Sequence, residues 1–287
     1  MPAPSTRTLS RTRERRRLIV NADDFGFTPA VTAGILEAHA AGTVTSTSMM
    51  VHCPGWDDGV RQANATPTLG VGLHLNLLVG APLAKVPSLT DRASGRFLPL
   101  TTIVLRALTG RIDSGEVAAE CEAQLDALAS AGIRCTHIDS HRHTHALPGI
   151  RRAVSALAAA RGLPLRRPVE SHFGPNGGLA SQLHRGVIAA SWRATSIGAA
   201  RTRAPEHFAG VSLQGSDGFA AQFITAIDAL ENGTTELMVH PGRVDGVLES
   251  LDGYTFERER ELAALTSPQL RERLRRDDLA LIGFRAL

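Results

Sequence analysis

Aromatic residues are scarce in this chain of 287 residues, at 4% of the total. Proteins that bind single-stranded nucleic acid stack bases on aromatic side chains, so this scarcity argues against a nucleic-acid partner. Cysteine is rarer still. The three cysteines are scattered and form no Cys-x-x-Cys pair, which predicts neither a disulfide framework nor a thiolate zinc site. Such usage fits a reducing compartment, and we expect a cytoplasmic protein.

Long apolar runs are also missing. No run reaches the roughly 18 residues that span a bilayer, so we expect no membrane partner. The segment from Met1 to Arg17 is polar and rich in arginine, and it lacks the apolar stretch of a secretory signal. We interpret residues 1–17 as a disordered basic tail that supplies much of the net charge of +3. Residues 18–287 then form one domain.

The sequence after the tail alternates between short apolar runs and amphipathic stretches. Residues 18–22 are apolar and long enough for a buried strand. Thr28 is a candidate helix N-cap, and Pro29 suits the first helical position. Gly42 can end this helix in a left-handed conformation. The segment therefore predicts one strand followed by one helix.

The same alternation continues to the end of the chain. We expect further strands at 45–51, 71–77, 135–140, 163–169, 208–213, 236–239 and 279–284. Amphipathic helices are expected at 114–131, 148–161 and 219–230, and residues 78–109 form an irregular excursion. Alternating strands and helices indicate a parallel sheet with right-handed crossovers. We predict a single α/β domain, a (β/α) barrel of seven or eight parallel strands rather than an open sheet.

Four clusters of polar residues follow directly after short apolar strands. They are NADDFG at 21–26, GLHLNL at 72–77, HIDSHRHTH at 137–145 and HPG at 240–242. In parallel α/β folds the carboxyl ends of the strands meet on one face, and ligands bind there. The shared placement of the four clusters therefore predicts one site at that face.

The first cluster contains two adjacent carboxylates, Asp23 and Asp24. In a regular strand they would point to opposite faces, and either alone could simply cap a turn. Here the strand must turn towards Thr28, so both can reach the site. Two unpaired carboxylates repel each other, and a cation would remove that cost. We expect Asp24 to bind a metal ion and Asp23 to act as a base.

The third cluster is rich in histidine. His137, Asp139, His141, His143 and His145 share odd parity, so a continuing strand would present all five on one face. A face with that many imidazoles makes a poor core, and neutral imidazole is the commonest side-chain metal ligand. The cluster therefore favours metal binding.

Two further histidines are ambiguous from their residues alone. His74 alternates with Leu73 and Leu75, and it could be a hydrogen-bonded histidine of the core. His240 stands at a strand end before Pro241, where it could act chemically or stabilise a turn.

The ordered motifs NADDFG, TSTSMMV, GLHLNL, HIDSHRHTH and ELMVHPG resemble the YdjC-like carbohydrate deacetylase family, which includes chitooligosaccharide deacetylases and relatives linked to hopanoid biosynthesis. The resemblance covers Leu18 to Gly242 in order and spacing, and it weakens towards the C-terminus. It implies a (β/α)-barrel fold related to the polysaccharide deacetylases. It also implies hydrolysis of the acetamide of an N-acetylated sugar, which would be the substrate.

The resemblance also implies the roles of the site residues. Asp24, His74 and His141 would ligate one divalent metal, with Asp23 as the general base and His240 as the general acid. His145 and Asp139 are additional site residues without an assigned role. The resemblance points to magnesium, whereas two nitrogens and one oxygen suit zinc or a similar transition metal.

Other readings stay open at this point. A metal-dependent phosphoesterase on the same barrel would use more ligands, which His143 and His145 could supply. A non-catalytic sugar-binding protein on the same scaffold is a second alternative. A glycosidase is disfavoured, because adjacent carboxylates do not straddle a glycosidic bond at roughly 5 Å or more. The sequence is also compatible with a homodimer.

Overall fold

The structure, a computed structural model, describes residues 16–170 and 179–287. Most of the predicted basic tail, residues 1–15, lies outside the described residues. The first strand, expected from residue 18, begins two residues earlier at Arg16. Arg16 and Arg17 therefore belong to the sheet.

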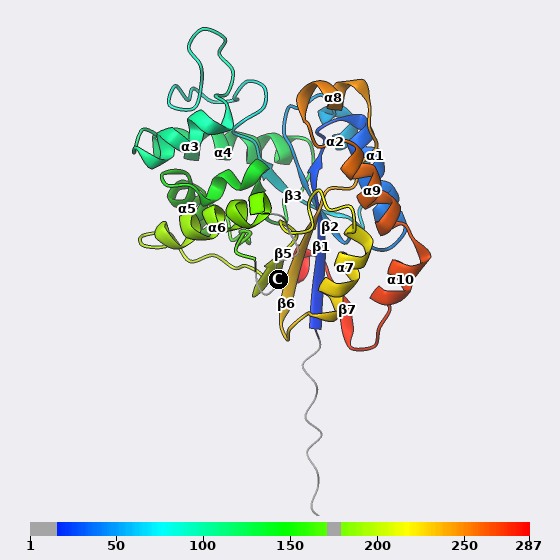
Figure 1. Ribbon diagram of the computed structural model, residues 1–287. Helices are drawn as coiled ribbons and strands as arrows, with labels where there is room; N and C mark the ends of the chain where they lie inside the picture. Colours follow the sequence, from blue (N-terminus) through cyan, green and yellow to red (C-terminus); the bar gives the residue numbers. More distant parts are fainter. Residues whose placement is uncertain (1–15, 171–178) are drawn as a thin grey trace, which may run out of the picture.

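A seven-stranded parallel sheet forms the centre of the fold (Figure 1). Its strands are β1 (Arg16–Phe25), β2 (Ser46–Met49), β3 (Gly70–Leu75), β4 (Ile138–Ser140), β5 (His207–Ala209), β6 (Thr234–Val239) and β7 (Leu279–Leu281). The order is β4-β3-β2-β1-β6-β5, and β7 pairs with the beginning of β1. Every ladder is parallel, as the alternation of strands and helices predicts.

The prediction of a closed barrel is wrong, because the sheet is a half-barrel. Among the described residues no ladder joins β4 to β5. The strand predicted at 163–169 is reduced to one bridge between Leu165 and Ile138. Pro164 and Pro168 flank that bridge, and proline has no amide hydrogen to donate to a ladder. The chain therefore crosses this gap without a full strand.

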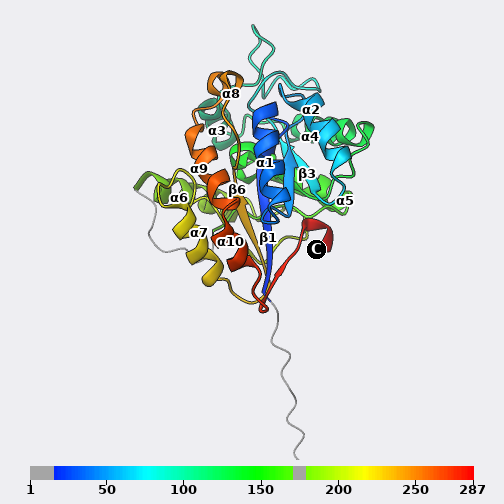
Figure 2. The same cartoon turned by 90° about the vertical axis from the view of Figure 1, so that its right-hand side faces the viewer.

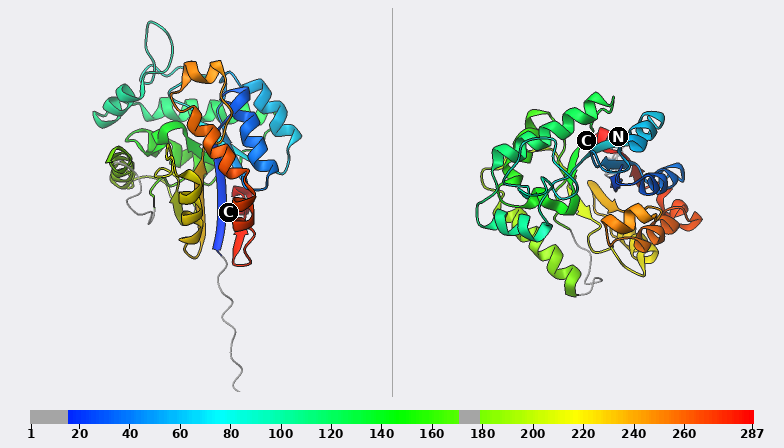
Figure 3. Two further views of the ribbon diagram at one scale, coloured as in Figure 1. Left: turned by 45° about the vertical axis from the view of Figure 1, so that its right-hand side comes forward. Right: turned by 90° about the horizontal axis from the view of Figure 1, so that it is seen from above.

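Helices surround the sheet, as the view from above shows (Figure 3). They are α1 (Pro29–Ala40), α2 (Trp56–Ala65), α3 (Leu100–Leu108), α4 (Ser114–Ser130), α5 (Ile150–Ala160), α6 (Leu179–Ala194), α7 (Phe219–Asp228), α8 (Gly246–Leu251), α9 (Phe256–Leu265) and α10 (Pro268–Leu274). Two 3-10 turns, η1 (His141–Ala146) and η2 (Phe284–Ala286), complete the described elements. In the described ranges no helix has the length and apolar character to cross a membrane.

Local signals explain α1. The Thr28 side chain accepts a hydrogen bond from the amide of Val31, and Pro29 occupies the first helical position. Gly42 follows the helix with φ of 82°. Figure 2 shows α1 lying along the sheet. The cap and the stop are therefore confirmed.

Part of the excursion predicted as irregular is helical. Residues 100–108 form α3, directly after Pro99. Pro99 stands immediately before the helix, where proline is tolerated because its nitrogen needs no intrahelical partner. Helices α2, α6, α8, α9 and α10 also lie outside the predicted helices.

Candidate metal centre

Asp23 and Asp24 end β1 at an irregularity in the sheet. The register between β1 and β2 shifts between Ala22 and Phe25, and Asp24 has a left-handed φ of 71°. Aspartate adopts this region more readily than most residues, because its short side chain can bond locally. The shift breaks the alternation of side chains, and both carboxylates line the same cavity. The structure therefore brings both carboxylates to one cavity.

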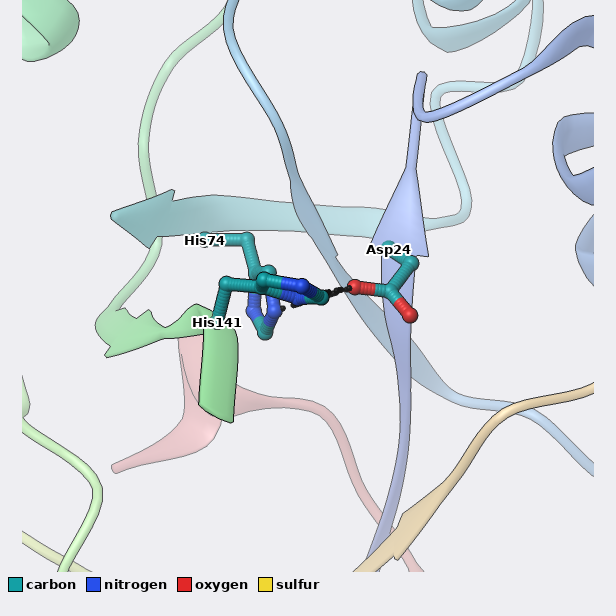
Figure 4. Close-up of side chains that lie close together, drawn as sticks. All are labelled: Asp24, His74 and His141. Atoms are coloured by element: carbon teal, nitrogen blue, oxygen red, sulfur yellow. Dashed lines mark hydrogen bonds and ion pairs between the residues drawn. The ribbon is translucent and has the colours of Figure 1, made fainter. Parts of the chain in front are cut away.

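Asp24, His74 and His141 meet at the carboxyl ends of three strands (Figure 4). One oxygen of Asp24, Oδ1, lies 3.1 Å from Nε2 of His74 and 3.1 Å from Nδ1 of His141. Ligands about 2.0 to 2.1 Å from an ion and at right angles around it lie about 3 Å apart. The spacing therefore fits a metal ion between these three side chains.

The charges around the three residues also favour a cation. His74 Nδ1 lies 2.7 Å from Oδ1 of Asp139 and 3.9 Å from Oδ2 of Asp23. Burial lowers the pKa of His74, but Asp139, Asp24 and Asp23 outweigh burial and raise it to about 10. The three aspartates around His74 thus stabilise a positive charge on its imidazole. A bound divalent cation would supply that charge and take the place of the proton.

Arg258 on α9 holds the second oxygen of Asp24. Its Nη2 lies 2.7 Å from Asp24 Oδ2 and 3.1 Å from Asp252 Oδ2, and the side chain is 1% exposed. Burial raises the pKa of Asp24, but Arg258 and His141 hold it well below its usual range. Asp24 therefore presents Oδ1 alone to the two imidazoles.

Arg166 holds Asp23 in a different way. Two of its nitrogens lie 2.6 Å from the two carboxylate oxygens of Asp23. It also lies 2.8 Å from Asp139 and 2.7 Å from Glu236, with no exposed side-chain surface. Burial raises the pKa of Glu236 to about 7, although Arg166 opposes the shift. One buried guanidinium thus contacts three carboxyl groups.

A second group, Asp23, His74 and Asp139, also has the composition of a metal site. Arg166 contacts both of its carboxylates and already provides a cation there. The triad of Asp24, His74 and His141 contacts Arg166 nowhere among the described contacts. The arrangement therefore favours one metal ion over two.

His240 lies beyond β6, at the edge of the same cavity. Its backbone amide donates to Oε2 of Glu261 at 2.6 Å, and its Nε2 lies 4.0 Å from Asp23 Oδ2. Burial lowers the pKa of His240 to about 4, against the opposing pull of Asp23 and Asp24. The imidazole is therefore neutral at neutral pH before a substrate binds.

The turn after His240 fits closely against α1. A Cβ added at Gly34 would lie 2.6 Å from Cα of Gly242, closer than real side chains allow. Glycine at both positions lets this turn approach the helix.

The histidine cluster does not form one strand face, so that prediction is wrong. β4 ends at Ser140, and residues 141–146 form η1, in which Arg142 and His143 both have φ of 54°. Two consecutive left-handed residues are costly, and such strain is found at functional sites. The turn points His141 into the site and divides the histidines among different surroundings.

Only part of the cluster reaches the cavity. His141 and His143 line it. His145 is enclosed, 2.5 Å from Ser140 Oγ and 3.1 Å from the backbone oxygen of Arg166. His137 stacks on Phe284 at 3.7 Å between ring centroids. His145 is thus placed to support the Arg166 backbone, not to meet a substrate.

Asp139 lies behind His74. Besides Arg166 and His74, it accepts a hydrogen bond of 2.8 Å from Ser48 Oγ. A carboxylate behind a histidine ligand fixes the tautomer and the ring orientation. Asp139 therefore orients His74 and has no direct access to the cavity among its described lining residues.

The sequence reasoning missed Arg166, Arg258 and Asp252. Arg166 follows the weak apolar run that ends at Leu165, so it repeats the pattern of a polar residue after a strand. Arg258 and Glu261 lie three residues apart on α9 and are both buried, a helical spacing that could have marked one inward face. Asp252, between α8 and α9, gives no such signal.

The cavity at the centre is narrow. It leaves about 30 Å³ accessible to water, enough for one or two water molecules or an ion with a ligand. Its lining residues are Asp23, Asp24, His74, Ser140, His141, Arg142, His143, Gln214, Met238, His240, Asp252 and Arg258.

The half-barrel and the buried group of two histidines and one aspartate define a parallel α/β protein with a candidate metal site at its strand ends. The sequence pattern of the YdjC-like protein family matches residues 17–276. The chain belongs to this family, and the resemblance inferred from its motifs is confirmed.

Several relatives match nearly the whole chain. A carbohydrate deacetylase of Brevibacillus brevis is 33% identical, over 94% of this chain and 99% of its own. A carbohydrate deacetylase of Geobacillus stearothermophilus is 35% identical, over 94% and 97%. A crystal structure from Enterococcus faecalis, described as a cellobiose-phosphate cleavage protein, has a TM-score of 0.77 and 29% identity and covers 95% of this chain and 98% of its own.

Proposed function

We propose that this protein is a metal-dependent hydrolase that removes the acetyl group from an N-acetylated sugar. The observation that carries this proposal is the convergence of Asp24, His74 and His141 at the strand ends, with their ligand atoms within 4.8 Å of one another. The relatives described as carbohydrate deacetylases support the choice of reaction.

Asp24 Oδ1, His74 Nε2 and His141 Nδ1 are the atoms that would hold the metal. A bound divalent ion supplies a polarised carbonyl and a water molecule of lowered pKa. Three protein ligands leave positions open for both, as a catalytic site requires. The family favours magnesium, and the two imidazoles suit zinc or a similar ion.

Asp23 and His240 are the residues placed to move protons. Asp23 lies on the cavity wall and would accept a proton from the attacking water. His240 begins neutral, because burial holds its pKa at about 4. Its Nε2 lies 4.0 Å from Asp23, close enough for a shared water to pass it the proton that the sugar nitrogen needs to depart.

The surroundings of Arg166 weigh against the phosphoesterase alternative. Two-metal sites place their ions roughly 3.5 to 4 Å apart, and the group that could hold a second ion here is paired with Arg166. The description of the Enterococcus relative still makes a phosphorylated disaccharide worth testing beside the acetylated sugar.

Cellular placement and assembly are further parts of the proposal. All three cysteines are free thiols, which supports a reducing compartment, and we propose the cytoplasm. We also propose a single domain that begins at Arg16, where the first strand begins, and follows a basic segment. A homodimer is testable by the mass of the protein in solution.

Acetate release from N-acetylglucosamine and its short oligomers tests the proposed reaction. The protein is assayed as purified, after treatment with a chelator, and after return of magnesium or zinc. Phosphate release from cellobiose phosphate is measured in parallel, together with metal content.

Metal-dependent release of acetate with one ion per chain is the expected result. Phosphate release with two ions per chain would favour the phosphoesterase. Sugar binding without release of either product would favour a binding protein.

A further inference from the structure

A second cavity lies at the opposite end of the sheet from the metal centre. Its volume is about 720 Å³, within the range of small-molecule sites. It is formed by segments that precede β4 and β5, by the end of α5 and by η2. The metal centre lies at the carboxyl ends of the strands, so the two cavities share no lining residue.

Arginine dominates this second cavity. Four of its ten described lining residues are Arg134, Arg161, Arg203 and Arg285, and none of these ten side chains is acidic. They come from four separate segments, so no single helix face accounts for them. Four guanidinium groups around one space repel each other, and an anion would offset that cost.

Arg203 and Arg285 have partners of different charge. Arg203 donates to the main-chain oxygens of Leu287, at 2.7 Å, and Gly162, at 2.6 Å. Arg285 donates to the main-chain oxygen of Pro67 at 2.9 Å. The Leu287 oxygen belongs to the terminal carboxylate of this chain and balances the charge of Arg203. The carbonyl of Pro67 is neutral, so it orients Arg285 without cancelling its charge.

The other two arginines differ from each other. Arg134 forms no hydrogen bond or ion pair with any described residue. Arg161 lies 2.7 Å from Glu122 and 3.6 Å from Asp126, so its charge is balanced from outside the cavity. Arg134 and Arg285 therefore carry the excess positive charge.

We infer that this cavity binds a small phosphorylated molecule. Guanidinium groups match phosphate oxygens with paired hydrogen bonds, and the volume admits a sugar or a similar group besides the phosphate. Among the described lining residues Phe284 is the only aromatic one, and it is 1% exposed and stacked on His137. No aromatic face is free for a base, which disfavours nucleic acid.

Calorimetric titration of the metal-loaded protein tests this site with two probes, inorganic phosphate and fructose 1,6-bisphosphate. The test variant is Arg134→Gln with Arg285→Gln. The matched control is Arg92→Gln with Arg96→Gln, which removes the same charge from an exposed loop outside the cavity. Circular dichroism and thermal unfolding of both variants check that they are folded.

The expected result is binding of the bisphosphate that weakens about tenfold or more in the cavity variant and stays unchanged in the control. Equal binding of both probes would identify phosphate itself as the ligand, and tighter binding of the bisphosphate would identify a phosphate ester. Absence of binding at millimolar concentration, equal weakening in both variants, or binding of a single-stranded oligonucleotide alone would overturn the inference.

Discussion

Asp23 and Asp24 are neighbours in the chain, yet the structure holds them by different arginines from different regions. Arg166, from the segment between β4 and β5, donates hydrogen bonds to both carboxylate oxygens of Asp23. Arg258, from α9, donates to one oxygen of Asp24, and the other oxygen faces two imidazoles. Asp23 thus belongs to an ion-pair network, and Asp24 keeps one oxygen available for a metal.

The difference shows how two identical side chains acquire separate tasks. A carboxylate with both oxygens paired is held rigidly beside the reaction site. A carboxylate with one oxygen paired is oriented as a ligand through a single atom. The arginine on each aspartate, and not the aspartate itself, makes this division.

The largest effect is expected on the Asp24 side. His141→Ala and His74→Ala should lose bound metal and with it acetate release, because each removes one of three ligands. His240→Ala should keep the metal, since its imidazole is not part of the triad. Metal analysis of the three folded variants is the measurement. Loss of metal from the His240 variant would contradict the division of roles.

On the Asp23 side, Asp23→Asn should keep the metal but lower turnover by about 10² to 10⁴, because asparagine cannot accept the proton. The structure adds a cost that the sequence did not reveal. Asparagine breaks the buried pair with Arg166, although Asp139 and Glu236 still balance that guanidinium. Turnover, metal content and denaturant unfolding are measured together. Near-normal turnover with metal bound would remove Asp23 from the role of base.

Replacing each arginine with methionine tests the difference between Asp23 and Asp24. Arg258→Met should weaken metal binding about 10- to 100-fold, the usual effect of losing a residue that orients a ligand. Arg166→Met should cost about 3 to 5 kcal/mol of stability, because it leaves buried carboxylates without their cation. Calorimetry with the metal and denaturant unfolding measure the two effects.

Arg243→Met is the matched control, since Arg243 pairs with Glu37 at the surface. It should cost about 0 to 1 kcal/mol and leave metal affinity unchanged. Equal metal affinity in the Arg258 and Arg243 variants would show that Arg258 does not orient the ligand.

The smallest effect concerns the pH dependence of stability. Glu236 has a folded pKa of about 7, raised from its ordinary 4.5 by burial, so its contribution to stability is present at low pH. That contribution is lost as pH rises from about 4.5 through 7. Glu236→Gln should therefore lose less stability than the native protein between pH 5 and pH 8. The measurement is the free energy of unfolding of both proteins at pH 5 and pH 8. An equal loss of stability in the two proteins would show that Glu236 is not the group that titrates.

Local chemistry in the sequence determined a good part of this protein. The Thr28 cap with Pro29 acts within one turn of helix, so neighbours in the chain suffice to predict it. The meeting of the polar clusters that contain Asp24, His74 and His141 at one face was also predicted from the sequence, because parallel strands bring their carboxyl ends to one edge. The choice of these three residues as a ligand set came from the family resemblance.

Only the tertiary structure decided which groups neutralise these carboxylates and whether the sheet closes. Arg166 and Asp23 are 143 residues apart, and Arg258 and Asp24 are 234 apart. No periodicity links positions so distant. The gap between β4 and β5 and the left-handed turn after His141 likewise depend on what the rest of the chain packs against them. The arginine–aspartate pairs and the closure of the sheet depend on which residues lie close together in space. The order of residues along the chain does not contain that information.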